Sequence, residues 1–561
     1  MASSNQNSLP LTTAGGKNHL VGLPAELLAS ILSHLPNRDI KSLRLTCGFF
    51  HATAKLRLNR IFLSANPRDV EVFRAIADHE TFRKGIIEII WDDAVIREPE
   101  LEGFDSEEEI ENRLAEEADG CPLWFSRECE ENNFNLKGRY QYDILDRPDR
   151  AIAAQLPLRE SWAYFRQLRS QQQDVISTGA DAAALRHGLA RFPSLHTITI
   201  TPAAHGNLLF PLYETPTIRA FPCGFNYPIP RGWPTTGEGE PVVKMPPWAD
   251  EDGGSEDERD KWRGFRIVMR TLTQQAEEHR VSELILNAHQ LDTGLNCRIF
   301  ERPCPEYHDL VVLLRRPGFR RLDLSLAVGG QEFLGWPAFR STFLKRALSE
   351  IGPDLEHLSL TTDVHADLDT WTFLQPSGGR MSHHVPLLST VFPIDRWPCL
   401  RHFGLSGFLV TQEDLLSLLS ALPATLRSLE LGNLYFLDGV GHWRGLLDDM
   451  RDRLGWRDRP ANTRPRVAIR VGEIDNQRRS GLAVWVDADV AKFLYGDGKN
   501  PFGRHDGEFP TQVNKGHAGV VRDAFDPEFE RPYVEPLELM QMGYIKKSPF
   551  FFPEVNRGSS S

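Results

Sequence analysis

The chain has 561 residues, of which 41% are hydrophobic, and its formal net charge at pH 7 is −13. A chain of this size can bury a large core, and length alone suggests about three or four domains unless the chain is a repeat protein. No apolar run reaches the roughly 18 residues of a membrane span, and neither the total charge nor its location is typical of a nucleic-acid binder.

The N-terminal segment, residues 1–19, is polar and lacks the apolar core of a signal peptide, so we expect a flexible tail. The seven cysteines are an odd number at irregular spacing, which favours free thiols in a reducing compartment, the cytoplasm or the nucleus. No two of them have the spacing and second pair of a zinc knuckle, so we expect no metal and no cofactor.

Residues 20–62 predict three short helices. Pro24 suits a first helical position, and the first helix shows apolar residues recurring at three and four positions: Leu27, Leu28, Ile31, Leu32 and Leu35. Pro36 ends it, and Asn37 can cap a second helix that carries Ile40, Leu43 and Leu45. A third helix is expected from about Phe49 to Leu58.

Three helices in about forty residues bury little surface, and the first has more apolar side chains than such a unit can hide. That excess is typical of a docking module. The alternative is an ordinary helical hairpin that packs on the rest of the chain.

This stretch contains the run Leu23-Pro24-x-Glu26-Leu27, Ile31-Leu32-x-x-Leu35, Asp39, Ser42-Leu43-Arg44, Cys47 and Phe50. In these residues it resembles an F-box, the module by which substrate receptors dock on the small adaptor of cullin–RING ubiquitin ligases. The resemblance implies adaptor contacts for Leu23, Pro24, Leu27, Ile31, Leu32, Leu35 and Leu43, some of which will instead be internal core.

Two segments hold most of the acidity. Residues 98–119 contain eleven acids against one Arg, and residues 237–260 contain nine acids against Lys244 and Arg259. We expect a mobile loop over about 230–260 and an acidic insertion at about 98–119, whose apolar residues could form a loose helix. Both could simply be solvated, or could attract a basic partner.

A pattern of apolar-x-x-apolar-x-apolar recurs along residues 63–475. Its seven copies begin at Ile86, Leu195, Val281, Phe319, Leu355, Leu400 and Leu426. The end of each copy alternates as a short strand does, and each follows a helix-like segment, often with a proline between them. Helices are expected to open at Asn66-Pro67, Asp181 and Thr411, and one helix should run from about Pro337 to Ile351.

Helix, stop and short strand, repeated, predict an α/β solenoid with a parallel sheet on its concave face. The pattern resembles leucine-rich repeat proteins. The repeat spacing is longer than usual, and the ladder position holds no Asn or Cys but Ala203, His289, Ala327, Asp363, Phe408 and Leu434. The expected fold is therefore a three-helix F-box followed by an irregular leucine-rich-repeat-like horseshoe, with an ordinary α/β domain as the alternative.

In such a sheet the residue between the two final apolar positions points outward. That row is Thr199, Ile285, Asp323, Ser359, Gly404 and Glu430, with a second row at Thr201, Asn287, Ser325, Thr361, Ser406 and Gly432. These rows suit a solvated face or a recognition surface. Our hypothesis is that the first row, with its adjoining loops, binds a protein target.

The repeat fades after about residue 475. Residues 476–561 predict a capping element, with Val484-Trp485-Val486 and Phe493-Leu494-Tyr495, and a partly disordered tail that ends in an aromatic cluster.

No catalytic constellation is visible: Phe408 occupies the second glycine of a nucleophile elbow, and Gly329-Gly330 lacks a phosphate-loop lysine. The resemblance implies a non-catalytic receptor that binds the ligase adaptor, through it cullin, and an unknown protein target. Two alternatives stay open: an adaptor-binding scaffold outside ubiquitination, and an enzyme with an unrecognised site.

Overall fold

The computed structural model of the chain describes residues 20–35, 37–98, 120–139, 148–235, 245–248, 256–289, 291, 293–331, 334–364, 385–436, 440–471, 482–502, 513–517 and 533–534. The chain divides into two compact units, an N-terminal unit (Met1–Asn59) and a sheet unit (Arg60–Ser561). Among the helices that the structure describes, none is both long enough and apolar enough to cross a membrane.

The described part of the N-terminal unit, from residue 20 onward, has three short helices, α1 (Ala25–His34), α2 (Asn37–Arg44) and α3 (Gly48–Thr53). Pro24 lies one position before α1, and Leu45 lies just beyond α2, so both helices are shorter than predicted. The third helix ends five residues before the predicted Leu58, and Arg60–Ser64 form the first strand of the sheet unit. The sheet therefore begins inside the range 20–62 that we expected for the helical module.

In the described residues, the sheet unit is built on one large sheet of 13 strands, and the order of its main path follows the chain. Nine neighbouring strands of this sheet pair in parallel. They are β1 (Arg60–Ser64), β2 (Glu88–Asp92), β3 (Thr197–Thr201), β4 (Glu283–Leu286), β6 (Arg321–Ala327), β7 (His357–Thr362), β8 (His402–Ser406), β10 (Ser428–Gly432) and β12 (Arg466–Val471). All seven predicted copies are strands of this sheet.

The remaining strands extend or flank the parallel run. β13 (Leu482–Trp485), β14 (Val513–His517) and β15 (Tyr533–Val534) continue the sheet in antiparallel pairing. β5 (Leu295–Asn296) pairs with β6, and β9 (Leu409–Val410) pairs with β11 (Tyr435–Phe436) outside the large sheet. The region after residue 475, for which a capping element is predicted, contains β13 and a helix, and most of the tail lies outside the described residues.

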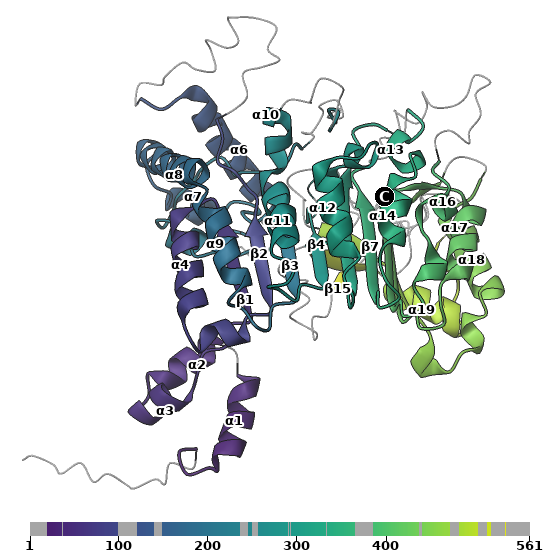
Figure 1. Cartoon of the computed structure of the whole chain (residues 1–561), viewed down its shortest axis with the longest axis horizontal. Helices are drawn as coiled ribbons and strands as arrows, with labels where there is room; N and C mark the ends of the chain where they lie inside the picture. Colours follow the sequence, from purple (N-terminus) through teal and green to yellow (C-terminus); the bar gives the residue numbers. More distant parts are fainter. Residues whose placement is uncertain are drawn as a thin grey trace, which may run out of the picture. The chain divides into compact units, whose positions relative to one another are not determined.

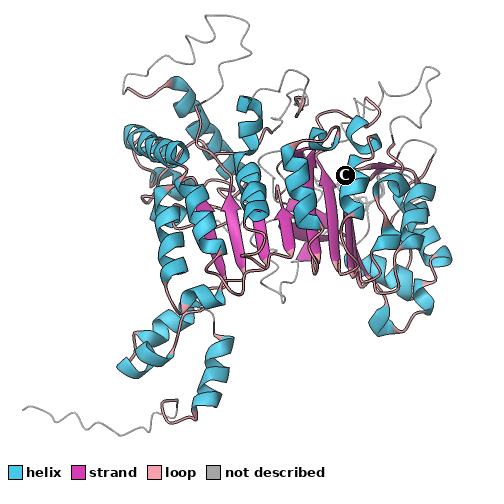
Figure 2. Cartoon of the chain, in the orientation of Figure 1, coloured by secondary structure: helices cyan, strands magenta, loops and turns pink. Residues whose placement is uncertain are grey.

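A layer of helices covers one face of the sheet (Figures 1 and 2), each helix touching the next along the chain. Its members are α4 (Pro67–Asp78), α9 (Ala180–Leu189), α11 (Arg263–Gln274), α12 (Pro305–Leu314), α14 (Phe343–Ser349), α16 (Leu388–Val391), α17 (Gln412–Ala421), α18 (Trp443–Arg453) and α19 (Asp487–Tyr495). The other helices are α6 (Leu123–Arg139), α7 (Pro148–Ala153), α8 (Leu158–Thr178), α10 (Glu256–Arg259) and α13 (Pro337–Arg340).

The core lies between the helix layer and the sheet. Every leading apolar residue of the seven copies is at most 2% exposed, as are nearly all the apolar residues that alternate along the strands. Two helix starts agree with the sequence prediction, because the side chain of Asn66 accepts from Arg68 N and that of Thr411 accepts from Asp414 N. Burial of these alternating residues is what holds each strand in register.

The helix predicted from Pro337 to Ile351 is broken into α13 and α14. Thr342 has a φ of 71°, a left-handed conformation that no α-helix tolerates in its interior. Thr342 therefore separates two short helices, and the continuous helix is a wrong prediction.

The loop expected over 230–260 is also partly wrong. Trp233 and Trp248 are each only 2% exposed, their indole Nε1 atoms donate to Asp93 and Glu306, and α10 begins at Glu256. The loop was predicted from the acidic composition of the segment, which gives no sign that these two tryptophans are buried. The rest of this loop, and nearly all of 98–119, lie outside the described residues.

Candidate functional site: an exposed apolar helix face and the outward face of the sheet

The structure sorts the seven residues for which adaptor contacts were expected. Leu27 and Ile31 are 54% and 40% exposed, and Pro24 is exposed as well. The other four, Leu23, Leu32, Leu35 and Leu43, are partly buried and pack against the core of the N-terminal unit. Thus three of the seven lie on the surface, while the other four also support the fold.

The core beneath them is small. It consists of Leu28, Ile40, Phe50 and Ala54, all at most 5% exposed. Such a core cannot cover the whole apolar face of α1, so Leu27 and Ile31, one helical turn apart, are left outside it.

Hydrogen bonds fix the end of α1. Arg57 donates from Nη1 to the carbonyl of Leu32 at 2.8 Å and from Nη2 to that of Leu35, and its backbone N–H donates to Asn37 Oδ1 at 2.9 Å. Asn37, expected to cap α2, therefore binds the segment after α3. This contact holds the helices in place below the exposed face.

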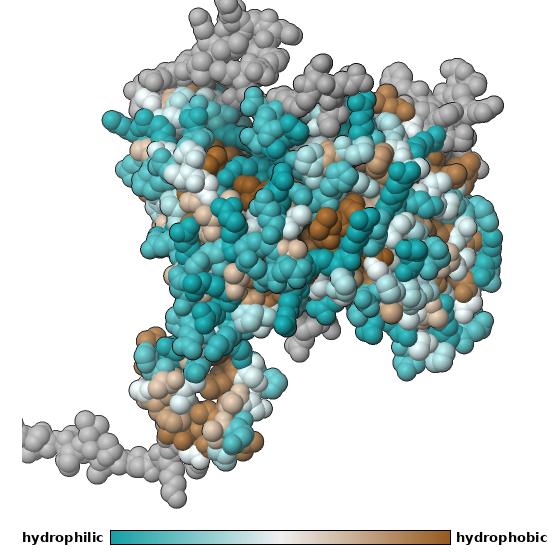
Figure 3. Space-filling view, in the orientation of Figure 1, coloured by the Kyte–Doolittle hydropathy of each residue, from teal (hydrophilic) through white to brown (hydrophobic). Residues whose placement is uncertain are grey.

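Three exposed large apolar side chains of the described N-terminal unit, Leu20, Leu45 and Phe49, were not among the expected contacts. Leu45 is 87% exposed and Phe49 is 39% exposed, and Figure 3 shows hydrophobic side chains gathered on the N-terminal unit. The apolar periodicity places Leu45 on the apolar face of the second helix. Because α2 ends at Arg44, Leu45 lies outside the helix and its side chain is exposed. The sequence prediction missed this exposure because it included Leu45 in the second helix, whereas Leu45 directly follows the last helical residue.

The predicted outward row exists as one line across six strands. The pairings are Thr199 to Ile285, Ile285 to Asp323, Asp323 to Ser359, Ser359 to Gly404 and Gly404 to Glu430. The row is unevenly accessible: Thr199 is 3% exposed and Gly404 is buried, while Ile285, Asp323, Ser359 and Glu430 are half-buried.

The second row shows the same register in its later part. Ser325, Thr361, Ser406 and Gly432 are successive partners, and Thr201 ends β3 as a buried residue. Asn287 follows β4, and its backbone N–H donates to the carbonyl of Ile200.

Charged side chains on the outward face pair with one another. Arg60 pairs with Glu88 at 3.0 Å, and Arg320 pairs with Glu283 at 2.7 Å. Asp323 pairs with Arg321 at 2.6 Å and with His357 at 2.8 Å. Burial disfavours the charge of Asp323, but the charges of His357 and Arg321 outweigh it and hold the pKa of this carboxyl well below its usual range.

A histidine stack adjoins this ion pair. The rings of His357 and His402 lie 4.0 Å apart at an interplanar angle of 10°. Burial and the neighbouring His357 lower the pKa of His402 to about 3, so the second ring of the stack is neutral at pH 7. In the described residues, His, Cys, Asp and Glu side chains form no group of three that could hold a metal ion, and all seven cysteines are free.

Comparison with known families identifies the helical module. Residues 20–61 match the model of the F-box domain, and no curated protein matches the chain. The chain therefore carries an F-box domain near its N-terminus. F-box domains bind the adaptor of SCF-type ubiquitin ligases and thereby cullin, which points in general terms to substrate recognition by such a ligase.

Proposed function

We propose that this protein is the substrate-recognition subunit of an SCF-type cullin–RING ubiquitin ligase. The observation that carries the proposal is the exposed apolar face of α1, where Leu27 and Ile31 stand outside the core of a matched F-box domain. Exposed apolar residues on so small a unit are favourable only when a partner covers them.

We further propose that the sheet unit is an irregular leucine-rich-repeat-like solenoid that holds a protein target. The strands of the parallel run follow one another in chain order, and each of them after β1 is preceded by a helix of a single layer, which supports this interpretation. The target would lie against the outward row Thr199, Ile285, Asp323, Ser359, Gly404 and Glu430 and its adjoining loops.

In this role the protein performs no chemistry of its own. F-box proteins usually act as non-enzymatic adaptors, and proximity of target and ubiquitin-conjugating enzyme accelerates transfer. A cytoplasmic or nuclear location belongs to the same proposal. The alternative function, an adaptor-binding scaffold outside ubiquitination, differs from the receptor only in that the bound target is not degraded.

The proposal is tested by co-purification of the full chain with the ligase adaptor. The informative variant is Leu27→Asp/Ile31→Asp, because both side chains are exposed and their replacement leaves the core intact. Central apolar contacts are worth about 2 kcal/mol or more each, so adaptor affinity should fall by about a hundredfold or more. The matched control is Leu334→Asp, the same change at a side chain of the sheet unit that is 76% exposed.

Capture by the wild type and the control, with loss in the double variant, supports the receptor. If the wild type fails to capture the adaptor, the proposal is wrong. If the double variant binds as tightly as the wild type, docking does not use this face of α1.

The outward row is tested separately. Ile285→Glu and Glu430→Lys change the chemistry of two half-buried positions in the row, so proteins captured by the wild-type chain should be lost from either variant while adaptor binding persists. An unchanged set of captured proteins would place the target elsewhere on the sheet unit.

A further inference from the structure

A cavity lies beside the carboxyl end of β2. Its volume is about 480 Å³. Four parts of the chain wall it: residues of Val95–Glu98 after the strand, the first turns of α6, the stretch from Pro228 to Thr235, and Lys261. A volume of this order is in the range of ligand pockets, and the carboxyl ends of parallel strands are where such pockets form.

Cations dominate the charged lining. Arg97, Arg127, Arg231 and Lys261 face two carboxylates, Glu98 and Glu128. Glu98 is already paired with Arg169, and Lys261 with Glu258 at 3.2 Å. Among the described residues, Arg97 and Arg127 have no ion-pair partner, while Arg231 makes no ion pair but is stabilised by the nearby charge of Glu128.

Arg231 is the most constrained of the three. Its Nη1 donates to the carbonyl of Gly206 at 2.6 Å, which directs the guanidinium between this cavity and a smaller one of about 150 Å³. Burial lowers the pKa of Arg231 to about 10, so the side chain is still charged at pH 7. A largely buried guanidinium is costly unless an anion accepts from it.

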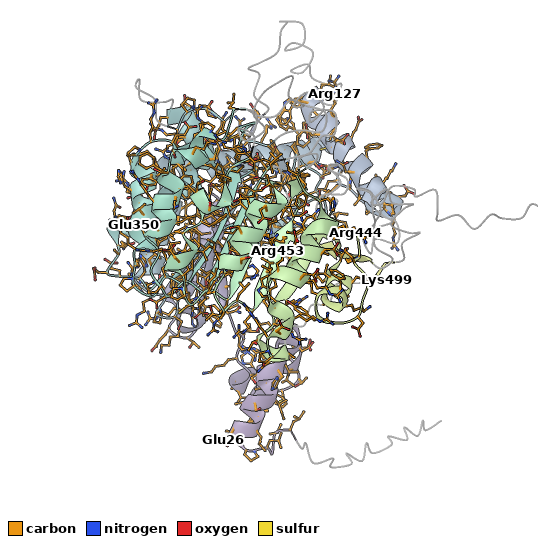
Figure 4. The ribbon with its side chains drawn as sticks, turned by 90° about the vertical axis from the view of Figure 1, so that its right-hand side faces the viewer. Glu26, Arg127, Glu350, Arg444, Arg453 and Lys499 are labelled. Carbon is orange, nitrogen blue, oxygen red and sulfur yellow. The ribbon has the colours of Figure 1, made fainter. Side chains whose placement is uncertain are left out.

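The apolar walls are rigid. Trp233 is held by a hydrogen bond from its Nε1 to Asp93 Oδ2 at 2.8 Å, and Gly232 lies so close to the backbone of Asp93 that an added Cβ would be 2.3 Å from its carbonyl oxygen. On α6, Trp124 packs edge-to-face on Trp162 and Phe165. Figure 4 shows Arg127, which comes from the same helix, at the outer edge of the ribbon.

The hydrogen bond of Trp233 and the ring contacts of Trp124 fix the aromatic walls, so the cavity is preformed, with arginines at its rim.

We propose that this cavity binds an anionic side chain, carboxylate or phosphate, of a peptide segment in which the neighbouring residue is apolar. The arginine guanidinium groups donate to the oxygens of such an anion in bidentate geometry, and the tryptophans cover the apolar neighbour. The inference rests on the proposed receptor function, in which the segment belongs to the target and the cavity is its anchor. On the outward row, by contrast, the charge of Asp323 is already paired within the protein.

The test measures binding of the full chain, in complex with the adaptor, to short synthetic peptides. The central residues of each peptide are Glu-Glu, phosphoserine or the uncharged Gln-Gln. The residues on either side are Leu, to supply the apolar neighbour, or Ser, to remove it. Peptides with an anionic centre and Leu flanks should bind, more weakly as salt rises, and the Glu and phosphoserine arms decide which anion is preferred.

The variant Arg97→Gln/Arg127→Gln should weaken this binding about tenfold or more. Both side chains are exposed and make no ion pair with a described residue, so the fold should not change. The matched control is Arg280→Gln/Arg302→Gln, which removes the same charge from exposed positions outside the cavity.

Equal binding of anionic and Gln-Gln peptides, or an unchanged affinity in Arg97→Gln/Arg127→Gln, would overturn the inference. Neither result bears on capture of the adaptor. The proposed receptor function would therefore be retained even if the proposal for the cavity failed. If the adaptor is not captured but the free chain binds the anionic peptides with this arginine dependence, the cavity stands and the ligase role fails.

Discussion

A single ion pair joins two helices of the layer. Asp181 of α9 is fully buried and receives two hydrogen bonds from Arg263 of α11, Nη1 to Oδ2 at 2.6 Å and Nη2 to Oδ1 at 3.0 Å. We predict that Asp181→Ala lowers the free energy of unfolding by about 3–5 kcal/mol, because it leaves a guanidinium buried without its partner. Urea unfolding of the full chain, followed by tryptophan fluorescence, measures this loss.

The control for this pair is Asp181→Ala/Arg263→Met, which removes both charges. It should be less destabilising than Asp181→Ala alone, because no unpaired charge is left behind. A double variant as unstable as the single one would mean that packing, and not the unpaired charge, accounts for the loss.

His205 makes stability depend on pH. Its ring Nδ1 lies 2.8 Å from the hydroxyl of Tyr227, its Nε2 lies 3.8 Å from Asp92, and burial together with Arg231 lowers its pKa to about 3. Since the unfolded histidine has a pKa of about 6.5, only the unfolded state takes up a proton as pH falls below that value. His205 therefore costs stability progressively from about pH 6.5 downward.

The expected result is a difference between two proteins. Relative to His205→Gln, which does not titrate, the wild type should lose about 2 kcal/mol of unfolding free energy between pH 7.5 and pH 5. Urea unfolding of both proteins at the two pH values measures the change, and the comparison cancels the buried carboxyls that titrate in both. A difference that stays constant with pH would show that His205 takes up its proton in the folded state.

At the scale of one element, Thr342 is a strained residue between α13 and α14. It is exposed, and its φ of 71° is unfavourable for a β-branched side chain. We predict that Thr342→Gly raises the free energy of unfolding by about 0.5–1 kcal/mol, because glycine adopts this conformation without strain. Thermal unfolding is the measurement.

The control is Lys345→Gly within α14, where the same replacement should lower stability by about 1 kcal/mol. If Thr342→Gly were as destabilising as this control, the residue would belong to a continuous helix, and the break between α13 and α14 would be wrong.

The strands of the sheet were largely predictable because burial imposes a pattern on them. Seven of the nine described parallel strands were found from the pattern, but two, β1 and β12, were missed. β1 fits the pattern with Leu58, Ile61 and Leu63, yet Leu58 was assigned to a helix; β12 has Arg464 where the pattern needs an apolar residue. Prediction of strands from local periodicity fails where the same residues also fit a helix, as at Leu58, or where the leading position of the pattern is polar, as at Arg464.

The candidate sites divide in the same way. The outward row follows from strand alternation, so its members could be numbered from the sequence. The cavity could not, because Arg97, Arg127 and Arg231 are far apart in the chain and come together only through the packing of α6 and Trp233. Likewise, the exposure of Leu27 and the burial of Leu28 depend on which side of α1 meets Ile40.

For the whole molecule, the division into an N-terminal unit and a sheet unit assigns the two proposed functions, adaptor docking and target binding, to different units. Each unit has its own core, Leu28, Ile40, Phe50 and Ala54 in the first, and the layer between sheet and helices in the second. Units with separate cores unfold independently unless a large interface couples them. We therefore predict that residues 60–561 fold without residues 1–59.

The fragment 60–561 should have the same urea midpoint as the sheet unit in the full chain, bind the anionic peptides as tightly, and show no adaptor binding. The complementary variant is Ile40→Ala in the full chain, which empties a position that is 1% exposed and should cost the N-terminal unit about 2–4 kcal/mol. Hydrogen exchange would then rise in residues 20–59 alone. A fragment with a lower midpoint, or faster exchange in the sheet unit of Ile40→Ala, would mean that the two units stabilise each other and that docking and target binding are not separable.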